Sequence, residues 1–130
     1  MVGLPSWKEI LDMCEAKGLL AKRLYVVFTK PKDLAKMGAL VPEHLEYQAE
    51  LERRGIMFGA GPLSDDTETK WNGDGMVIIR ARDMAEAKKI ADADPMHAGG
   101  GRGYEIRPWL MNEGTISIRV NYTTGKYTME

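Results

Sequence analysis

Two short runs of strand-forming residues, Leu24–Thr29 and Met76–Ala81, are apolar on both faces, and they constrain the fold more than any other feature. Successive side chains of a strand point to opposite faces, so Leu24 and Val26 oppose Tyr25. Strands of this kind are normally covered on both sides. Since two helices cover only one face, we expect a second subunit to cover the other. The alternative is that the N-terminal helix or the C-terminal strand folds over it.

The chain alternates strand and helix signals in a recognisable order. Glycine, proline and capping residues divide it into strand, helix, strand, strand, helix and strand, which is the split β-α-β signature. The predicted fold class is therefore α+β: a ferredoxin-like βαββαβ domain with an antiparallel sheet and helices on one face. The expected elements, in chain order, are Leu24–Thr29, Glu43–Arg54 (opened by Pro42), an irregular Ile56–Leu63, Met76–Ala81, Asp83–Ala91 (ended by Asp94-Pro95) and Tyr104–Leu110.

Segments outside this core give weaker signals. Ser6 and Glu9 have the spacing of a capping box, which predicts a short N-terminal helix that ends near Gly18. Alternating apolar residues in Thr115–Tyr122 predict an additional strand, and Ser64–Asp74 is expected to be an exposed loop. We expect a helical extension over residues 1–22, the ferredoxin-fold domain over 23–112, and a C-terminal strand or tail of the same domain over 113–130.

Composition excludes several classes of function. A net charge of −1 without a block rich in Lys and Arg argues against nucleic-acid binding. No apolar run is long enough for a membrane span. Cys14 is the only cysteine, so we expect no internal disulfide and a cytoplasmic location. One cysteine and two histidines do not make a zinc site of the Cys/His type. Because the chain also lacks a nicotinamide or flavin fingerprint, we expect no metal and no cofactor.

His44 is the first candidate for chemistry because of its place on its helix. At 100° per residue, it shares one stripe with Tyr47, Gln48 and Leu51, whereas charged residues gather opposite. An inward imidazole can act as general acid or base near neutral pH. Tyr47, on the same stripe, is a candidate substrate contact. The alternative for His44 is a histidine at the core edge that is satisfied by a backbone carbonyl.

Asp94 is the second candidate and lies where the second core helix is expected to end. A carboxylate before proline usually only caps a turn, and that remains the alternative. If the fold brings it to His44, Asp94 would hold one imidazole tautomer and stabilise the imidazolium formed during proton transfer.

Three further residues are candidates for substrate binding. His97 can reach a ligand from a mobile loop, or can simply be solvated. Arg102, like Arg107, can hold a carboxylate, although surface solvation is the commoner role. Ser64 can donate a hydrogen bond, or can be a turn serine. The neighbouring Gly99–Gly101 run is not a phosphate loop, because it lacks the Lys-Ser/Thr pair and precedes a strand.

Taken together, these motifs resemble the YCII (YciI-like) family over roughly Leu24 to Trp109. The residues that carry the resemblance are His44-Leu45-Glu46-Tyr47, Leu51, Gly55, Gly59-Ala60-Gly61-Pro62-Leu63, Gly75–Ala81, Asp83–Ala91, Asp94-Pro95 and Pro108-Trp109. The resemblance implies a dimeric α/β barrel, in which two sheets pack face to face, and an active-site pair at His44 and Asp94.

The resemblance also implies a chemistry. A characterised relative is a dehydrochlorinase of chlorinated hydroxyhydroquinones, and muconolactone isomerase is similar in fold. We therefore expect a cofactor-independent isomerase or lyase that uses a His–Asp pair on a small metabolite of aromatic degradation, such as a lactone or a chlorinated hydroquinone. One alternative is a non-catalytic binding or accessory protein that uses the same pocket. Another, by fold analogy alone, is a cofactor-free oxygenase.

Overall fold

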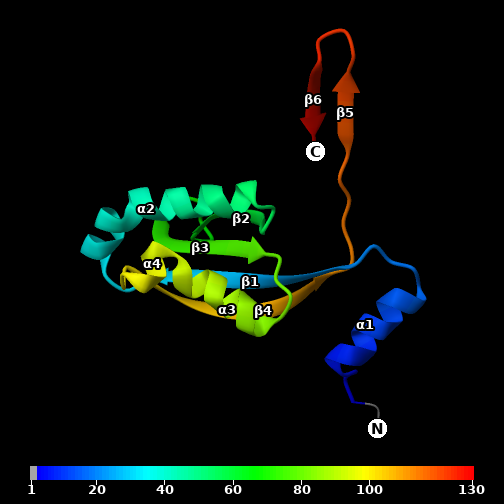
Figure 1. Ribbon diagram of the computed structural model, residues 1–130, viewed down its shortest axis with the longest axis horizontal. Helices are drawn as coiled ribbons and strands as arrows, with labels where there is room; N and C mark the ends of the chain where they lie inside the picture. Colours follow the sequence, from blue (N-terminus) through cyan, green and yellow to red (C-terminus); the bar gives the residue numbers. More distant parts are fainter. Residues whose placement is uncertain (1–2) are drawn as a thin grey trace. The chain divides into compact units, whose positions relative to one another are not determined.

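The computed structural model describes residues 3–130, and this part of the chain divides into two compact units (Figure 1). One unit spans Arg23–Trp109. The other combines the segments on either side, up to Lys22 and from Leu110 onward. The first unit contains the core of the predicted domain and all the candidate site residues.

A four-stranded sheet in the order β2-β3-β1-β4 forms the centre of the first unit. Its strands are β1 (Lys22–Pro31), β2 (Met57–Ser64), β3 (Trp71–Ile79) and β4 (Arg102–Met111). Both β1 and β2 run antiparallel to β3, with Val27 opposite Val77. The two strands that are apolar on both faces, β1 and β3, are thus the central pair. This order confirms the predicted ferredoxin-like α+β class.

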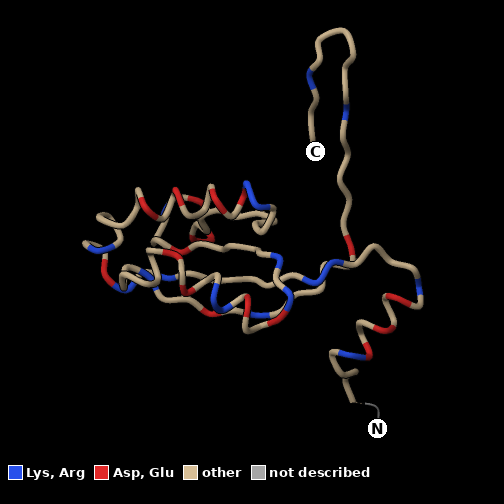
Figure 2. The backbone as a smooth tube through the Cα atoms, viewed as in Figure 1, with Lys and Arg blue, Asp and Glu red and all other residues tan. Residues whose placement is uncertain are grey.

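Two long helices and a single-turn helix complete this unit: α2 (Leu34–Arg53), α3 (Met84–Ala93) and α4 (Pro95–Ala98). Ala87 of α3 packs in one buried cluster with Val27 and Ile79. A small void lined by Leu51 of α2, together with Val27, Ile79 and Ile90, shows that α2 and α3 cover the same sheet face. Acidic residues recur along α2 and are red in Figure 2; of these, Glu43 and Glu46 are exposed to solvent. Within residues 3–130, no helix is long and apolar enough to cross a bilayer.

The start of α2 corrects the prediction. The helix begins at Leu34 and not near Glu43, so Pro42 lies inside it and does not open it. The Asp33 side chain caps this earlier start by accepting from the Lys36 backbone N–H at 3.1 Å. A proline inside a helix removes one backbone hydrogen bond and costs about 3 kcal/mol. Packing of the long helix on the sheet outweighs that cost.

The expected loop Ser64–Asp74 is also corrected. It shrinks to residues 65–70, because β3 begins at Trp71 and not at Met76 and pairs Trp71 with Ser64 of β2. The polar start of β3 gave no apolar alternation from which to predict a strand. The predicted irregularity of β2 is confirmed, with register shifts between Met57 and Gly59 and between Pro62 and Ser64.

The predicted start and end of α3 are both present. The Asp83 side chain accepts from the Glu86 N–H at 2.9 Å, and α3 ends at Ala93, immediately before Asp94-Pro95. The capping box is incomplete, since the Glu86 carboxylate accepts from the N–H of Arg82 and not from that of Asp83.

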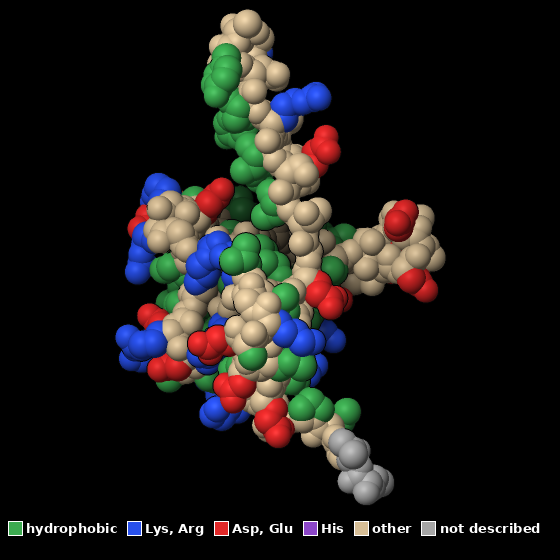
Figure 3. Space-filling model, turned by 90° about the vertical axis from the view of Figure 1, so that its right-hand side faces the viewer, with side chains coloured by type: hydrophobic (Ala, Val, Ile, Leu, Met, Phe, Trp, Pro, Cys, Tyr) green, Lys and Arg blue, Asp and Glu red, His purple; other side chains and the backbone are tan. Residues whose placement is uncertain are grey.

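The second unit contains one helix and one hairpin. Helix α1 (Trp7–Ala16) opens with the predicted capping box of Ser6 and Glu9. Strands β5 (Ile118–Asn121) and β6 (Lys126–Met129) form an antiparallel two-stranded sheet, of which β5 lies within the predicted strand Thr115–Tyr122. Hydrophobic side chains run along this hairpin and are green in Figure 3.

Candidate active site

The structure brings His44 and Asp94 together. His44 projects from α2, and Asp94 lies at the junction between α3 and α4. The Nδ1 atom of His44 is 2.9 Å from both carboxylate oxygens of Asp94. The exposed fractions of the two side chains are 15% and 4%, so the pair is largely shielded from water. Only the imidazole is partly accessible.

Two further donors fix the Asp94 carboxylate. The Gln48 amide donates to Oδ2 at 2.9 Å, and the Met96 backbone N–H donates to Oδ1 at 2.9 Å. Burial alone raises the pKa of Asp94, but the hydrogen bonds from His44 and Met96 together outweigh it, and the resulting pKa lies below its usual value. Asp94 is therefore a carboxylate at neutral pH.

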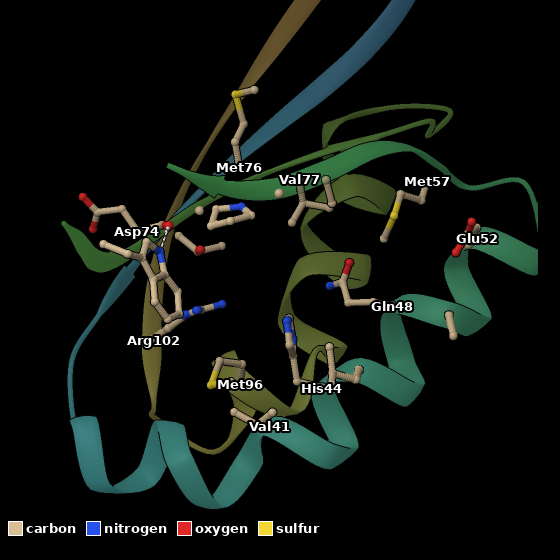
Figure 4. Close-up of a pocket in the computed structure, with 18 of the residues that line it drawn as sticks. Val41, His44, Gln48, Glu52, Met57, Asp74, Met76, Val77, Met96 and Arg102 are labelled. Atoms are coloured by element: carbon tan, nitrogen blue, oxygen red, sulfur yellow. Dashed lines mark hydrogen bonds between the residues drawn. The ribbon is translucent and has the colours of Figure 1, made fainter. Parts of the chain in front are cut away.

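An ionised carboxylate only accepts hydrogen bonds, so the Nδ1 atom of neutral His44 must carry the proton that it shares with Asp94. The proton-free nitrogen is then Nε2, to which no protein hydrogen bond is made in residues 3–130. His44 lines a large cavity and points into it (Figure 4). The arrangement supplies a general base with one fixed tautomer.

The cavity has a volume of about 830 Å³ and is lined by residues of β1, α2, β2, β3, α4 and β4. Its walls are mostly apolar, with Met57, Met76, Met96, Val77 and Trp71 among them. The Trp71 indole is held in place by a hydrogen bond of 2.8 Å from Nε1 to the carbonyl of Asp74. An apolar cavity with a few polar groups is the usual form of a small-molecule site, and methionine and tryptophan suit a flat ring.

Three polar atoms in the cavity lining are buried and lack a hydrogen-bond partner among the described residues: Thr29 Oγ1, Gln48 Oε1 and Arg102 Nε. Desolvation lowers the pKa of Arg102, while the charges of Asp94 and Asp74 act in the opposite direction. Because buried polar groups in folded proteins are nearly always paired, these three atoms are free to bind water or a ligand in the cavity.

The other candidate substrate contacts divide into two groups. Arg102 and Ser64 line the cavity; the Ser64 hydroxyl donates to the carbonyl of Asp65 at 2.9 Å. Tyr47 and His97 instead line the small void between the helices and the sheet. Tyr47 donates to the carbonyl of Ile90 at 2.7 Å, and desolvation together with the nearby Asp94 raises its pKa.

His97 is fixed as a core histidine. Its Nδ1 lies 2.7 Å from the carbonyl of Ala91, and its ring centroid is 4.8 Å from that of Tyr104. A histidine bonded to a backbone carbonyl, considered above as the alternative for His44, is thus found at His97, although its Nε2 is buried without a partner among the described residues.

Sequence reasoning missed Thr29, Gln48 and Trp71 as site residues. Gln48 follows His44 by one helical turn on the same stripe, and that spacing is a usable signal. Thr29 continues the alternation of Tyr25 and Val27 on the helix-covered face, where a polar residue calls for a partner. Trp71 fell in the predicted loop and gave no signal.

Comparison with known proteins supports the fold. One similar solved structure is 5-chloro-2-hydroxyhydroquinone dehydrochlorinase from Burkholderia phenoliruptrix, in complex with 2,5-dihydroxybenzoquinone. The two share 17% sequence identity and a TM-score of 0.51, over 66% of this chain and 92% of that chain. No curated protein matches the chain.

The family is established by a match over most of the chain. The YCII-related domain matches residues 23–110, about two thirds of the 130 residues. This range includes both members of the His44–Asp94 pair and every residue of the cavity lining. The chain therefore belongs to the YCII-related domain family.

Proposed function

We propose that the cavity is the active site of a cofactor-independent acid–base enzyme, an isomerase or a lyase. The observation that carries the proposal is the His44–Asp94 contact: Nδ1 is held by a buried carboxylate at 2.9 Å, and Nε2 is left free in a cavity large enough for a small molecule. A base with a fixed tautomer, an apolar pocket and few polar contacts suits proton transfer.

The proposed reaction begins when His44 Nε2 removes a proton from an acidic C–H or O–H of the substrate. The Asp94 carboxylate offsets the positive charge that develops on the imidazole. In an elimination, the released electron pair moves into the substrate and the leaving group departs with the electrons of its bond. In an isomerisation, the same proton returns at another carbon. Neither route transfers electrons to or from the protein, so neither requires a redox cofactor.

The substrate class is supported by the cavity and by the structural neighbour. Methionine and tryptophan walls suit a flat oxygenated ring, and the neighbour is a dehydrochlorinase bound to a dihydroxybenzoquinone. We therefore propose a metabolite of aromatic degradation, such as a lactone or a chlorinated hydroquinone, with Ser64 and Arg102 as substrate contacts. Cys14 as the only cysteine fits activity in the reducing cytoplasm.

We also propose a homodimer, as the family resemblance implies. The resemblance implies contact between the two four-stranded sheets; the β5–β6 hairpin, on which Ile118, Val120, Tyr127 and Met129 are all exposed, is a second candidate interface.

The test compares the two histidines. Native protein, His44→Gln and His97→Gln are assayed by ultraviolet absorbance on chlorinated hydroquinones, lactones and unsaturated diacids, after dialysis against a chelator. We expect His44→Gln to lower the turnover number by about 10²- to 10⁴-fold, the usual contribution of general acid–base catalysis. His97→Gln, which changes a histidine outside the cavity, should retain turnover within a few-fold.

The same assay separates the alternatives. Equal turnover by native protein and His44→Gln would refute the acid–base role. Binding of the panel without product formation by the native protein would instead support a binding or accessory protein. Loss of turnover under nitrogen would support an oxygenase.

A further inference from the structure

Arg102 brings a cation into the cavity that makes no direct ion pair among the described residues. Its guanidinium is protonated at every relevant pH, yet none of the ion pairs in residues 3–130 includes it. Its Nε atom is buried and unpaired, and the nearest aromatic partner is the Trp71 ring, 5.9 Å from its central carbon. The charges of Asp94 and Asp74 favour this cation from a distance, but neither carboxylate hydrogen-bonds it, and its buried Nε–H has no acceptor among the described residues. A negatively charged ligand would satisfy it.

Thr29 adds a second unsatisfied group on the sheet side of the cavity. Only 3% of Thr29 is exposed, and its hydroxyl oxygen has no partner among the described residues. It projects from β1, the strand next to β4, which carries Arg102. A threonine hydroxyl can rotate to donate to an anion. The sheet side of the cavity therefore offers two donors, and one of them is charged.

On the helix side of the cavity, Gln48 presents a hydrogen-bond acceptor and not a donor. Its amide nitrogen is held by Asp94 at 2.9 Å, which fixes the amide orientation and leaves Oε1 buried without a partner. Oε1 can only accept, as can the free Nε2 of neutral His44, one helical turn away. Figure 4 shows His44 and Gln48 entering the cavity from α2, and Arg102 entering from another side. The helix side therefore offers two acceptors.

From this distribution of donors and acceptors we infer that the cavity selects an anionic, hydroxylated ring: Arg102 and Thr29 bind a negatively charged oxygen, while Gln48 and His44 accept hydrogen bonds from a hydroxyl group. The inference rests on the function proposed above and narrows its substrate class. The charged oxygen can belong to an ionised hydroxyl or to a carboxylate. A neutral ring would give Arg102 no charged acceptor within hydrogen-bond distance, and a ring without a hydroxyl would leave Gln48 without a donor.

The test uses three probes of similar size in titration calorimetry near neutral pH. They are 4-nitrocatechol, which carries one ionised and one neutral hydroxyl, 2,5-dihydroxybenzoate, which carries a carboxylate, and uncharged hydroquinone. We expect native protein to bind at least one of the anions about tenfold or more tighter than hydroquinone, the range expected of a hydrogen bond to a charged group. The anion that binds tighter identifies the source of the charge.

Two arginines on the same strand provide the matched variants. Arg102→Gln should weaken the preferred anion by about tenfold to a hundredfold and leave hydroquinone within about twofold. Arg107→Gln, at an exposed position of β4, should change neither. Thr29→Val, which keeps the side-chain shape, should weaken the anion several-fold. Circular dichroism of each variant checks that it is folded.

The inference is overturned if hydroquinone binds as tightly as both anions, or if Arg102→Gln keeps the anion preference. Either result would leave the acid–base proposal standing, because that proposal is judged by the turnover of His44→Gln. Conversely, an anion preference that depends on Arg102, together with turnover that does not depend on His44, would sustain the inference and refute the proposed catalysis.

Discussion

Asp94 combines a structural and a site role in one side chain. Its carboxylate accepts from the Met96 N–H, which caps α4, and from His44 and Gln48, which face the cavity. The break between α3 and α4 and the orientation of the imidazole therefore depend on the same group. A change at Asp94 should affect stability and the site together, whereas a change at His44 should affect mainly the site.

The lowered pKa of Asp94 predicts a pH dependence of stability. A carboxylate whose pKa is lower in the folded state stabilises the fold above its unfolded pKa of about 3.9, and this contribution is lost as pH falls through the folded pKa. We expect Asp94→Asn to be about 2 kcal/mol less stable than native protein in urea denaturation near pH 6, with the gap narrowing as the pH falls below about 3.9.

The control for this experiment is Asp66→Asn, which removes an exposed carboxylate and should leave stability unchanged at both pH values. If the curves of native protein and Asp94→Asn stay parallel across the acid range, the hydrogen bonds of Asp94 do not favour its ionised form.

At Thr29, in contrast to Asp94, we expect a substitution to weaken ligand binding without lowering stability. Its hydroxyl is buried without a partner, so Thr29→Val removes an unsatisfied group and keeps the shape. We expect the free energy of unfolding to stay constant or to rise by up to about 1 kcal/mol, although binding of the anionic probe weakens. Urea denaturation and calorimetry on the same sample measure both quantities.

Thr128→Val, on exposed β6, is the control and should not alter binding. A clear loss of stability in Thr29→Val would mean that the hydroxyl serves the fold.

Among the elements, the glycine run before β4 has a packing role. A Cβ atom at Gly101 would lie 3.1 Å from the backbone N and Cα of Met37 in α2, and one at Gly99 would lie 2.6 Å from Leu40. The short segment between α4 and β4 thus passes directly against α2. This close approach explains glycine here without a phosphate ligand, and it positions Arg102 at the start of β4.

Two glycine substitutions should have effects of opposite sign on stability. Gly101→Ala forces backbone apart and should lower the free energy of unfolding by about 1–3 kcal/mol. Gly38→Ala lies inside α2 with open space around the new methyl group and should raise it by about 0.5–1 kcal/mol. Thermal and urea denaturation of both variants give the comparison. A stabilised Gly101→Ala would contradict the close packing of the segment on α2.

The same elements show how far the sequence alone leads. The run of strand-forming residues Leu24–Thr29 and the Asp94-Pro95 break predicted the central strand and the end of α3, because both signals are local. The start of α2 was missed since Pro42 is tolerated by tertiary packing, which no local pattern records. The start of β3 was missed because pairing with β2, and not apolar alternation, makes Trp71 part of a strand.

The site residues likewise divide into those with a local sequence signal and those that depend on tertiary contacts. Helical spacing placed His44 on the inward stripe and offered Asp94 only as a conditional partner, and the family resemblance paired the two. Spacing did not show that His97 is fixed beside the core, where its Nδ1 donates to the carbonyl of Ala91, whereas His44 faces the cavity. The unpaired atoms of Thr29 and Gln48 depend on distances between elements, and these exist only in the folded chain.

At the scale of the whole molecule, the C-terminal hairpin is the feature that most needs a partner. Ile118 pairs with Met129 and Val120 pairs with Tyr127, and alternation places these two pairs on one face. All four side chains are between 59% and 70% exposed. A two-stranded hairpin is at best marginally stable alone in water, and a continuous exposed apolar face usually marks an interface. In a symmetric dimer, the hairpin face of each copy would be buried against that of the other.

We therefore expect native protein to sediment as a dimer at micromolar concentration. The double variant Val120→Lys/Tyr127→Lys should weaken dimerisation by about tenfold or more, because side chains buried at an interface can contribute over 1 kcal/mol each. Thr128→Lys places the same charge on the other face of β6 and should leave the dimer intact. Because the cavity is lined only by residues within Arg23–Trp109, a monomeric double variant should still bind the anionic probe. A native monomer at all concentrations, or a double variant that dimerises as before, would show that the hairpin face is not the interface.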